Sequence, residues 1–339
     1  DLELIQKCIE CDNYEILIFL LEKYEGSYSD LIKTSLQNGN IYLYNYFKVQ
    51  GKIPKDMLPY SIRPGNLELV KNFIDIKGID INAKNNDGDT SLMLASDYGY
   101  TDIVECLLSK DKIDVNIQNE DGETALIMAS NKGNTDVVRK LLSVKEININ
   151  LKDEGNWTAL FYACFESNMD IIKMLLSRKE VELNGKNNYG YTPLMYGCTE
   201  SHIDVVKLLL SQEGIKINEK NKDGNTALIF ACENENIEIV KMLLSKQGIE
   251  INAQNDDEVS ALMIACMNGN YNVVKLLLSC EGIEFNAKSN DGTTSLIFAC
   301  KNSHPKIAQL LLNQPGIQYE MESIPKDNPY ILDLFNKNN

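Results

Sequence analysis

Nine cysteines and two histidines are the residues of this chain that could form a metal site, a disulfide or a nucleophile. Five of the cysteines stand 34 residues apart, each beside Ala or Gly: Cys164, Cys198, Cys232, Cys266 and Cys300. Because these five cysteines recur at one fixed interval, we expect them to be small core residues in a reducing compartment. On stacked helices roughly 8 to 10 Å apart they would exceed the Cα separation of roughly 7 Å that a disulfide allows.

The other candidates for chemistry are isolated. Cys8 and Cys11 form a lone Cys-x-x-Cys on an expected helix, without the second pair or His that a zinc site needs. His202 and His304 are 102 residues apart in the same repeat phase, so neither joins a catalytic triad. We therefore expect no catalytic activity.

The acidic turns do not match a calcium loop. The closest case, Glu219, Asn221 and Asp223 before Gly224, has Phe230 where the loop needs a bidentate Glu. Phosphate-binding glycine motifs are also missing from the sequence. We expect neither a metal nor a cofactor.

Composition narrows the classes of partner. The 339 residues are 44% hydrophobic and 24% charged, with a formal net charge of -16, which predicts a soluble protein folded throughout. This charge disfavours nucleic acid and anionic membranes and favours a basic protein partner, although it could serve solubility alone. The apolar stretch Ile16 to Leu21 is far too short to span a membrane, so we expect a cytoplasmic protein. The chain begins at Asp1 without an initiator Met, which is compatible with a piece of a longer protein.

The elements that carry these residues repeat with a period of 34. An Asn after an apolar residue recurs at that step, as do a Thr or Ser with Leu two residues later and a pair of leucines. The Asn set is Asn82, Asn116, Asn150, Asn184, Asn218, Asn252 and Asn286.

Each unit reads as turn, helix, turn, helix. In residues 223–248, Asp-Gly-Asn-Thr predicts a turn and then a helix capped by Thr226. Asn236 is in the phase to cap the second helix, as are Asn134, Asn168 and Asn270 in other units, and Gly248 is in the phase to end it, as are Gly214 and Gly282. Such a unit buries its apolar stripe only by stacking on neighbours.

These units resemble the ankyrin repeat family, most closely at Tyr189-Gly190-Tyr191-Thr192-Pro193-Leu194, with Val205-Val206, Leu209-Leu210 and Ile217-Asn218 following. The resemblance implies an all-α solenoid of stacked helix-turn-helix units with short hairpin-like turns. The His of the family's Thr-Pro-Leu-His start is replaced here by an apolar residue, such as Met195. We expect its hydrogen bonds between repeats to be missing and packing to substitute for them.

The repeats predict three regions. Seven regular repeats cover residues 82–319, and residues 1–81 hold degenerate ones, with helical pairs near residues 58–74, 31–47 and 4–21 and the cap-phase residues Asn66, Asn40 and Asn13. Residues 320–339 leave the pattern and predict a C-terminal capping helix.

The family resemblance places partner binding on a concave face, lined by the residue before each helix-start Thr and by the end of each first helix. Trp157, Phe165, Tyr189 and Tyr191 fall there in the two central units, with acidic positions such as Glu123 beside them. Aromatic anchors in a polar rim are typical of interaction hot spots. The candidate partner-binding residues are Trp157, Phe165, Tyr189, Tyr191, Glu123, Val259 and Met267. The alternative is that the rings only pack on neighbouring hairpins.

Two functions follow from this reading. The first is a rigid scaffold that binds a protein presenting basic or apolar side chains. The second is a structural spacer or anchor in a cytoskeletal or other large assembly. In either case we expect a monomer or a part of a larger assembly.

Overall fold

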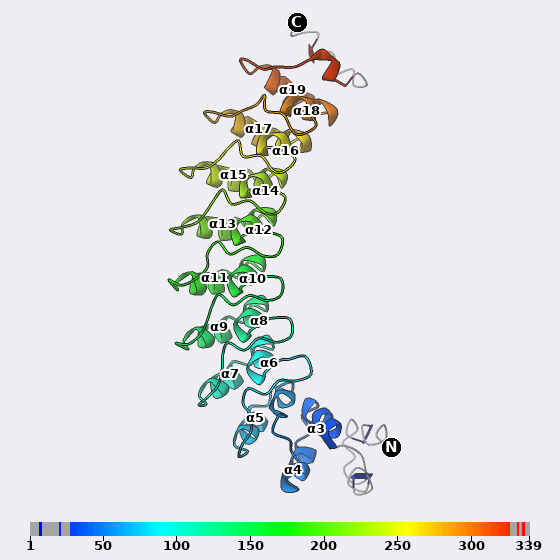
Figure 1. The fold of residues 1–339 in the computed structure, drawn as a ribbon, viewed down its shortest axis with the longest axis vertical. Coiled ribbons are helices and arrows are strands. Elements are labelled where there is room, and N and C mark those ends of the chain that lie inside the picture. The colour runs from blue at the N-terminus through cyan, green and yellow to red at the C-terminus, as the bar shows by residue number, and fades with distance from the viewer. Residues whose placement is uncertain (1–6, 9–19, 22–27, 326–330, 332–333, 336–339) are drawn as a thin grey trace. The chain divides into compact units, whose positions relative to one another are not determined.

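The computed structural model describes residues 7–8, 20–21, 28–325, 331 and 334–335 (Figure 1). Among these residues it has 17 α-helices, two short 3-10 helices and no strand. The first helices of the regular repeats are α6 (Ser91–Asp97), α8 (Ala125–Asn131), α10 (Ala159–Phe165), α12 (Pro193–Thr199), α14 (Ala227–Glu233), α16 (Ala261–Asn268) and α18 (Ser295–Lys301). The second helices are α7 (Thr101–Leu108), α9 (Thr135–Leu142), α11 (Met169–Leu176), α13 (Ile203–Leu210), α15 (Ile237–Leu244), α17 (Tyr271–Leu278) and α19 (Pro305–Leu312).

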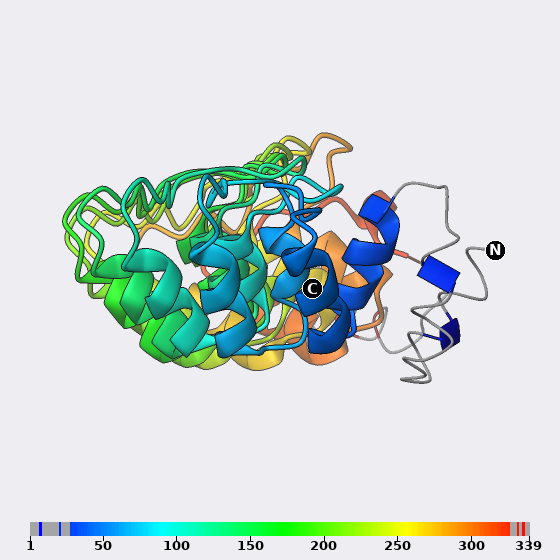
Figure 2. The ribbon, with the colours of Figure 1, turned by 90° about the horizontal axis from the view of Figure 1, so that it is seen from below.

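The chain forms two compact units, residues 1–181 and residues 182–339. In the first unit α6 packs on α8 and α8 on α10, while α7, α9 and α11 form a parallel row. The second unit repeats this with α12, α14, α16 and α18 in one row and α13, α15, α17 and α19 in the other. Within each unit the connecting turns lie together on one side of the helices (Figure 2). The predicted all-α stack of helical pairs is confirmed.

A Thr or Ser cap starts every regular first helix. The side chain accepts a hydrogen bond from the amide three residues on, as in Thr124 Oγ1 with Ile127 N at 3.2 Å. At Thr90, Thr192 and Ser260 the capping residue's own amide also contacts a Met sulfur, 3.3 Å away for Met93. These sulfurs occupy the position that holds His in the family pattern.

The starts of the second helices differ from the prediction at several positions. Asn236, Asn66 and Asn40 do cap their helices, each accepting at 3.1 Å from the third amide. Asn134, Asn168 and Asn270 stand at the cap position but make no capping bond. Their side-chain amides donate instead to carbonyls at the end of the first helix of the preceding repeat. Asn134 donates to Ser96 O and Asp97 O, Asn168 to Ser130 O, and Asn270 to Cys232 O. The last carbonyls of a helix have no partner within it, so they accept hydrogen bonds from these Asn side chains, which then do not cap their own helices.

The glycines after the second helices also sit later than expected. α13, α15 and α17 already end at Ser caps, Ser211, Ser245 and Ser279. Gly214, Gly248 and Gly282 follow three residues beyond, at φ between 80° and 83°, where they turn the chain.

Hydrogen bonds do link the repeats, so packing is not the sole substitute for the missing His. The Asn of each repeat end donates to a carbonyl 30 residues on, as in Asn218 Nδ2 to Gly248 O at 2.8 Å. Its Oδ1 accepts from the amide 32 residues on, Glu250 N at 3.1 Å. The same bonds recur at Asn82, Asn116, Asn184, Asn252 and Asn286. The 34-residue spacing of these Asn residues thus gives each repeat a side-chain amide that bonds to the following residues.

The core runs between the two rows of helices in each unit. Val205, Val206 and Leu209 of α13 are fully buried, as are Cys198, Cys232 and Cys266 on the first helices. The cysteines in the described residues are free thiols, as the fixed phase of five of them predicts.

The outer regions are described in part. α3 (Tyr28–Gln37) pairs with α4 (Ile41–Val49), and the 3-10 helix η1 (Leu58–Ser61) pairs with α5 (Leu67–Ile74). The expected pair in residues 4–21, with Cys11 and Asn13, lies outside the described residues apart from residues 7–8 and 20–21. The 3-10 helix η2 (Met321–Ser323) and the buried Ile331 and Phe335 lie in the C-terminal region. Most of the expected capping helix lies outside the described residues. The three-region division stays a prediction.

Candidate functional site

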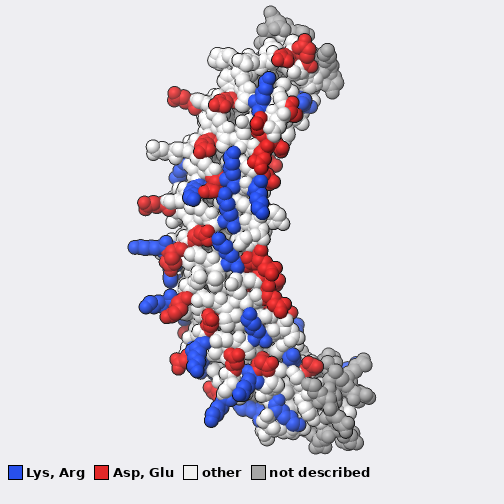
Figure 3. All heavy atoms as spheres, in the orientation of Figure 1, with Lys and Arg blue, Asp and Glu red and all other residues white. Residues whose placement is uncertain are grey.

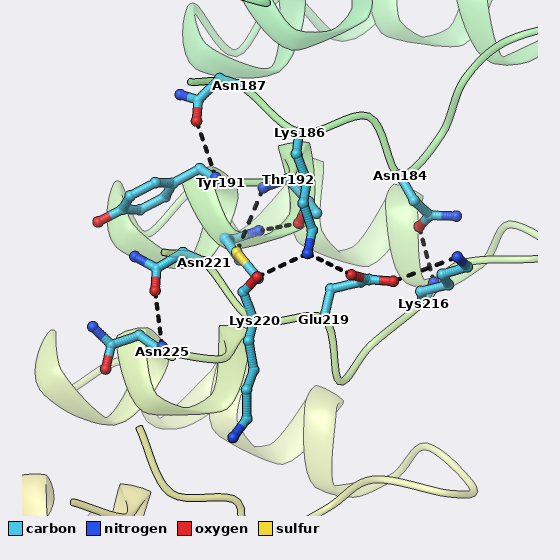
Figure 4. Close-up of polar contacts among 11 residues, drawn as sticks. Asn184, Lys186, Asn187, Tyr191, Thr192, Lys216, Glu219, Lys220, Asn221 and Asn225 are labelled. Atoms are coloured by element: carbon cyan, nitrogen blue, oxygen red, sulfur yellow. Dashed lines mark hydrogen bonds and ion pairs between the residues drawn. The ribbon is translucent and has the colours of Figure 1, made fainter. Parts of the chain in front are cut away.

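The turns before the first helices are shaped by one side chain each. Asn187 Oδ1 accepts from the amides of Tyr189 and Tyr191, both at 3.0 Å, and Asn221 Oδ1 accepts from those of Asp223 and Asn225. Figure 4 shows the bonds to Tyr191 and Asn225. Asn85, Asn119 and Asn255 repeat this pattern. A short side chain that bonds its own backbone two residues on stabilises a tight turn. We call these turns, together with the ends of the first helices, the turn face.

Neighbouring turns are joined by backbone and lysine hydrogen bonds. Lys222 N donates to Tyr189 O at 3.0 Å, and Asp256 N donates to Asp223 O at 3.0 Å. Lys186 Nζ reaches Lys220 O at 2.8 Å and the Glu219 carboxylate at 2.6 Å, and Lys216 lies 3.4 Å from the same carboxylate (Figure 4). Lys186 therefore lowers the pKa of Glu219, which is engaged by cations of its own chain. The turn face is consequently preorganised.

In the first unit an aromatic cluster surrounds Trp157. Its ring lies 4.6 Å from that of Phe161, 5.0 Å from Tyr162 and 5.5 Å from Phe165, between centroids. Asp153 holds the arrangement, because its carboxylate accepts from Trp157 N and from Tyr162 Oη, both at 2.7 Å. Burial, followed by this bond to Asp153, raises the pKa of Tyr162.

Exposure separates the members of this cluster. Trp157 lies in the turn before α10 and is half-buried against the rings of that helix, whereas Phe165 at the end of α10 keeps 37% of its surface exposed. Phe165 thus offers a ring to solvent, and Trp157 supports it.

Two partly desolvated carboxylates precede this cluster. Asn119 Nδ2 donates to Asp89 Oδ1 at 2.9 Å and to Glu123 Oε2 at 3.2 Å, joining two adjacent turns. Burial raises the pKa of both Asp89 and Glu123 above the ordinary carboxyl values. Amide bonds oppose that shift without cancelling it.

In the second unit the two tyrosines have different roles. Tyr191 stacks on Phe230 of the next repeat at 5.0 Å and contacts Tyr196 at 5.1 Å, so its ring packs on a neighbouring hairpin as the alternative expected. Tyr189, at the tip of the turn, is 68% exposed. Tyr189 is thus the accessible ring of this pair.

Val259 and Met267 belong to the same unit and are half-buried. The Val259 amide is held by Asn255 Oδ1 at 2.9 Å, and the Met267 carbonyl lies 3.1 Å from His304 Nε2. His304 therefore links α19 to the end of α16, as a structural residue of the repeat.

The seven predicted residues fall into two groups. Glu123, Trp157 and Phe165 lie in the first unit, and Tyr189, Tyr191, Val259 and Met267 lie in the second. Sequence reasoning missed Asp153, Tyr162, Phe230 and the turn-forming Asn residues. The Asn residues carried a signal, since five of them follow the 34-residue period: Asn85, Asn119, Asn187, Asn221 and Asn255.

Charge is distributed unevenly around the helices. Glu166, Glu200 and Glu233 are exposed at the ends of first helices. Figure 3 shows Asp and Glu side chains towards the edge on the side of the first helices, and Lys and Arg side chains nearer the middle of the view. The helix-end part of the turn face is thus acidic.

The buried thiols are unsuited to nucleophilic chemistry. Burial raises the pKa of Cys164, Cys198, Cys232 and Cys266, and raises that of Cys300 to about 12. A thiol is reactive as its thiolate, which these groups do not form near neutral pH. Across the described residues no group of three His, Cys, Asp or Glu side chains is arranged to hold a metal ion. In that part of the chain, too, the helices are all too short or too polar to cross a bilayer.

Comparison with known proteins gives one family. A family model described as ankyrin repeats, in three copies, matches residues 58–153, 144–221, 186–255 and 247–323, which is well over half of the chain. No curated protein matches.

Proposed function

Because this chain belongs to the ankyrin repeat family, whose members are generally protein-protein interaction modules and typically non-catalytic, we propose that it is a scaffold that binds a protein partner through its turn face. The observation that carries this proposal is the exposure of Tyr189 and Phe165, at 68% and 37%, on turns and helix ends that are otherwise tied down by hydrogen bonds. Turns and helix ends held in this way lose little entropy on binding, so an exposed ring in either unit can supply affinity.

The proposed partner presents basic and apolar side chains. Exposed Glu166 and Glu200 follow the first helices that carry or adjoin the rings, and opposite charges around an apolar anchor favour association. The proposed setting is cytoplasmic. We also propose that Trp157 and Tyr191 act as supports for the exposed rings.

The test uses the exposed rings, because neither belongs to the buried core. The variant Phe165→Ala, Tyr189→Ala is compared with the unaltered chain in affinity capture from the source cell, and the dissociation constant is then measured with the purified partner. Removal of hot-spot rings is expected to weaken binding by about tenfold or more.

The matched control is Tyr271→Ala, which removes an exposed ring from the second helix α17. It should leave the dissociation constant unchanged. If the double variant binds as tightly as the control, the proposed face is wrong, and contacts distributed along the array would fit a spacer or anchor instead.

A further inference from the structure

A pocket of about 330 Å³ lies on the first unit, away from the aromatic cluster at Trp157. It is walled by η1 and the residues after it, by the turn at residues 85–89, by α6 and by α8. Its lining combines two rings, Tyr60 and Tyr98, with Asp87, Asp89 and Asp97 and one opposing cation, Arg63. A volume at the lower end of the range for ligand pockets suits a single side chain better than a cofactor.

Asp89, a buried carboxylate in the lining of this pocket, indicates the charge of the ligand. It is 8% exposed, and its hydrogen-bond partner through Oδ1 is the neutral amide of Asn119. In the part of the chain that the structure describes, no Lys or Arg lies within ion-pair distance of Asp89. A buried carboxylate without a cation is costly, and a cation entering the pocket would remove that cost.

The other carboxylates leave the pocket negative. Asp97 is only loosely paired, with Lys132 Nζ at 3.8 Å, and Asp87 is exposed and contacts an Asn amide at 3.5 Å. Arg63 is exposed at the edge and offsets one of the three charges. The remaining charge attracts a cation, but the carboxylates are not arranged to hold a bare metal ion.

The rings specify which cation fits. Tyr98 is 45% exposed and lies against Tyr100, with centroids 5.5 Å apart, so it offers ring surface to a ligand. Tyr60 already has partners for its hydroxyl and its ring. The hydroxyl donates to Asn86 Oδ1 at 3.0 Å, and Lys33 Nζ lies 5.0 Å from the ring centroid. A planar guanidinium can stack on one ring and bond carboxylates at its edge, which an ammonium cannot do as well.

We propose that this pocket, between η1, α6 and α8, binds an arginine side chain of a protein partner. This inference rests on the proposed function, because the arginine is supplied by the partner. Leu94 and Met128, which also line the pocket, would pack on the arginine's aliphatic stem.

The test uses a small probe, so that it does not depend on knowing the partner. N-acetyl-arginine amide is titrated into the whole chain, with N-acetyl-citrulline amide as its neutral isostere and N-acetyl-lysine amide as the ammonium probe. Nuclear magnetic resonance follows the methyl signals of Leu94 and Met128 and the ring of Tyr98. The arginine probe is expected to give saturable shifts at these three residues and to bind at least about tenfold more tightly than the other two. Citrulline lacks the charge, and the ammonium of lysine cannot stack on a ring and bond two carboxylate oxygens side by side.

Substitutions in the wall complete the test. Asp89→Asn and Asp97→Asn keep shape while removing charge, and each should weaken the arginine probe severalfold. Asp102→Asn, which neutralises an exposed carboxylate on α7, should not. Equal binding of citrulline or lysine, or insensitivity to both wall substitutions, would overturn the inference. If the probe fails while the Phe165→Ala, Tyr189→Ala variant still loses its partner, only the pocket is wrong; if the probe binds and that variant keeps its partner, only the proposed ring contacts are wrong.

Discussion

At the scale of single residues, most of the polar side chains that matter act on backbone close to them. Thr caps bond the third amide of their own helix, and turn-forming Asn residues bond amides two and four residues on. These contacts are local, so each can be removed without disturbing distant parts of the chain.

Removing a cap should have a modest, defined cost. Thr124→Ala deletes the 3.2 Å bond to Ile127 N and leaves a first-turn amide without its partner. We expect a loss of about 1 kcal/mol in the free energy of unfolding. Urea denaturation measures it, with Thr124→Ser as the control, since Ser260 caps α16 in the same way. An equal loss in the Ser variant would contradict the capping explanation.

The desolvated carboxylates make stability depend on pH. The pKa of Asp89 is raised in the folded state from the ordinary value of 3.8, so the folded state holds that proton more tightly than the unfolded state does. Its contribution to stability is therefore greatest in acid and falls as the pH rises from near the unfolded pKa through the folded one. Glu123 acts in the same direction.

Asp89→Asn should consequently reduce the fall in the free energy of unfolding as the pH rises above about 4, the range in which unfolded carboxyl groups ionise. Urea midpoints measured across this range provide the check. The control is Asp136→Asn, an exposed carboxylate in the first turn of α9. A pH profile that Asp89→Asn leaves unchanged would rule out this carboxylate as the source.

At the scale of elements, the repeats are joined by both packing and hydrogen bonds. Each regular first helix packs on its neighbours in the same unit, and the Asn at each repeat end spans to the next. At three of the positions where the family pattern has His, a Met sulfur contacts the amide of the capping residue, as Met195 does at Thr192. The interface between repeats is thus polar at its edge and apolar within.

The contribution of one Asn at a repeat end can be measured by substituting it alone. Asn218→Ala removes the bonds to Gly248 O and from Glu250 N, and we expect a loss of about 1 to 2 kcal/mol, since each neutral hydrogen bond contributes about 1 kcal/mol net. Thermal and urea unfolding measure it. Asn272→Ala, at an exposed position of α17, should change stability by less than about 0.5 kcal/mol. Equal effects at the two positions would refute a specific role for the Asn bonds.

At the scale of the whole molecule, stability is expected to be a sum over neighbouring repeats within each compact unit. Within a unit each repeat touches those before and after it, so damage should spread from the site of a substitution to the neighbouring repeats of that unit. No single core ties all repeats together in such an architecture.

Leu209→Ala examines this in the second unit. Leu209 is fully buried on α13, so the cavity should cost roughly 2 to 5 kcal/mol. Hydrogen exchange should show the greatest loss of protection in α12 to α15, with less towards α18. Lys207→Ala, on the exposed side of α13, is the control. Equal loss of protection in every repeat of the unit would contradict the nearest-neighbour picture.

The 34-residue period, the helix pairs and the Thr caps were determined by the sequence itself, because capping and amphipathic spacing are local properties. The tertiary structure decided which Asn residues at the cap position cap a helix. Asn134 donates to the carbonyls of Ser96 and Asp97, 38 and 37 positions earlier, whereas Asn236 accepts from an amide of its own helix. It also decided that Tyr191 packs while Tyr189 is exposed, because Phe230 lies in the following repeat. The pocket at Asp89 and Tyr98 depends on side chains from α3 to α8, whose approach no local pattern encodes. Contacts between repeats are made by residues about 30 or more positions apart, and only the stacked chain brings them together.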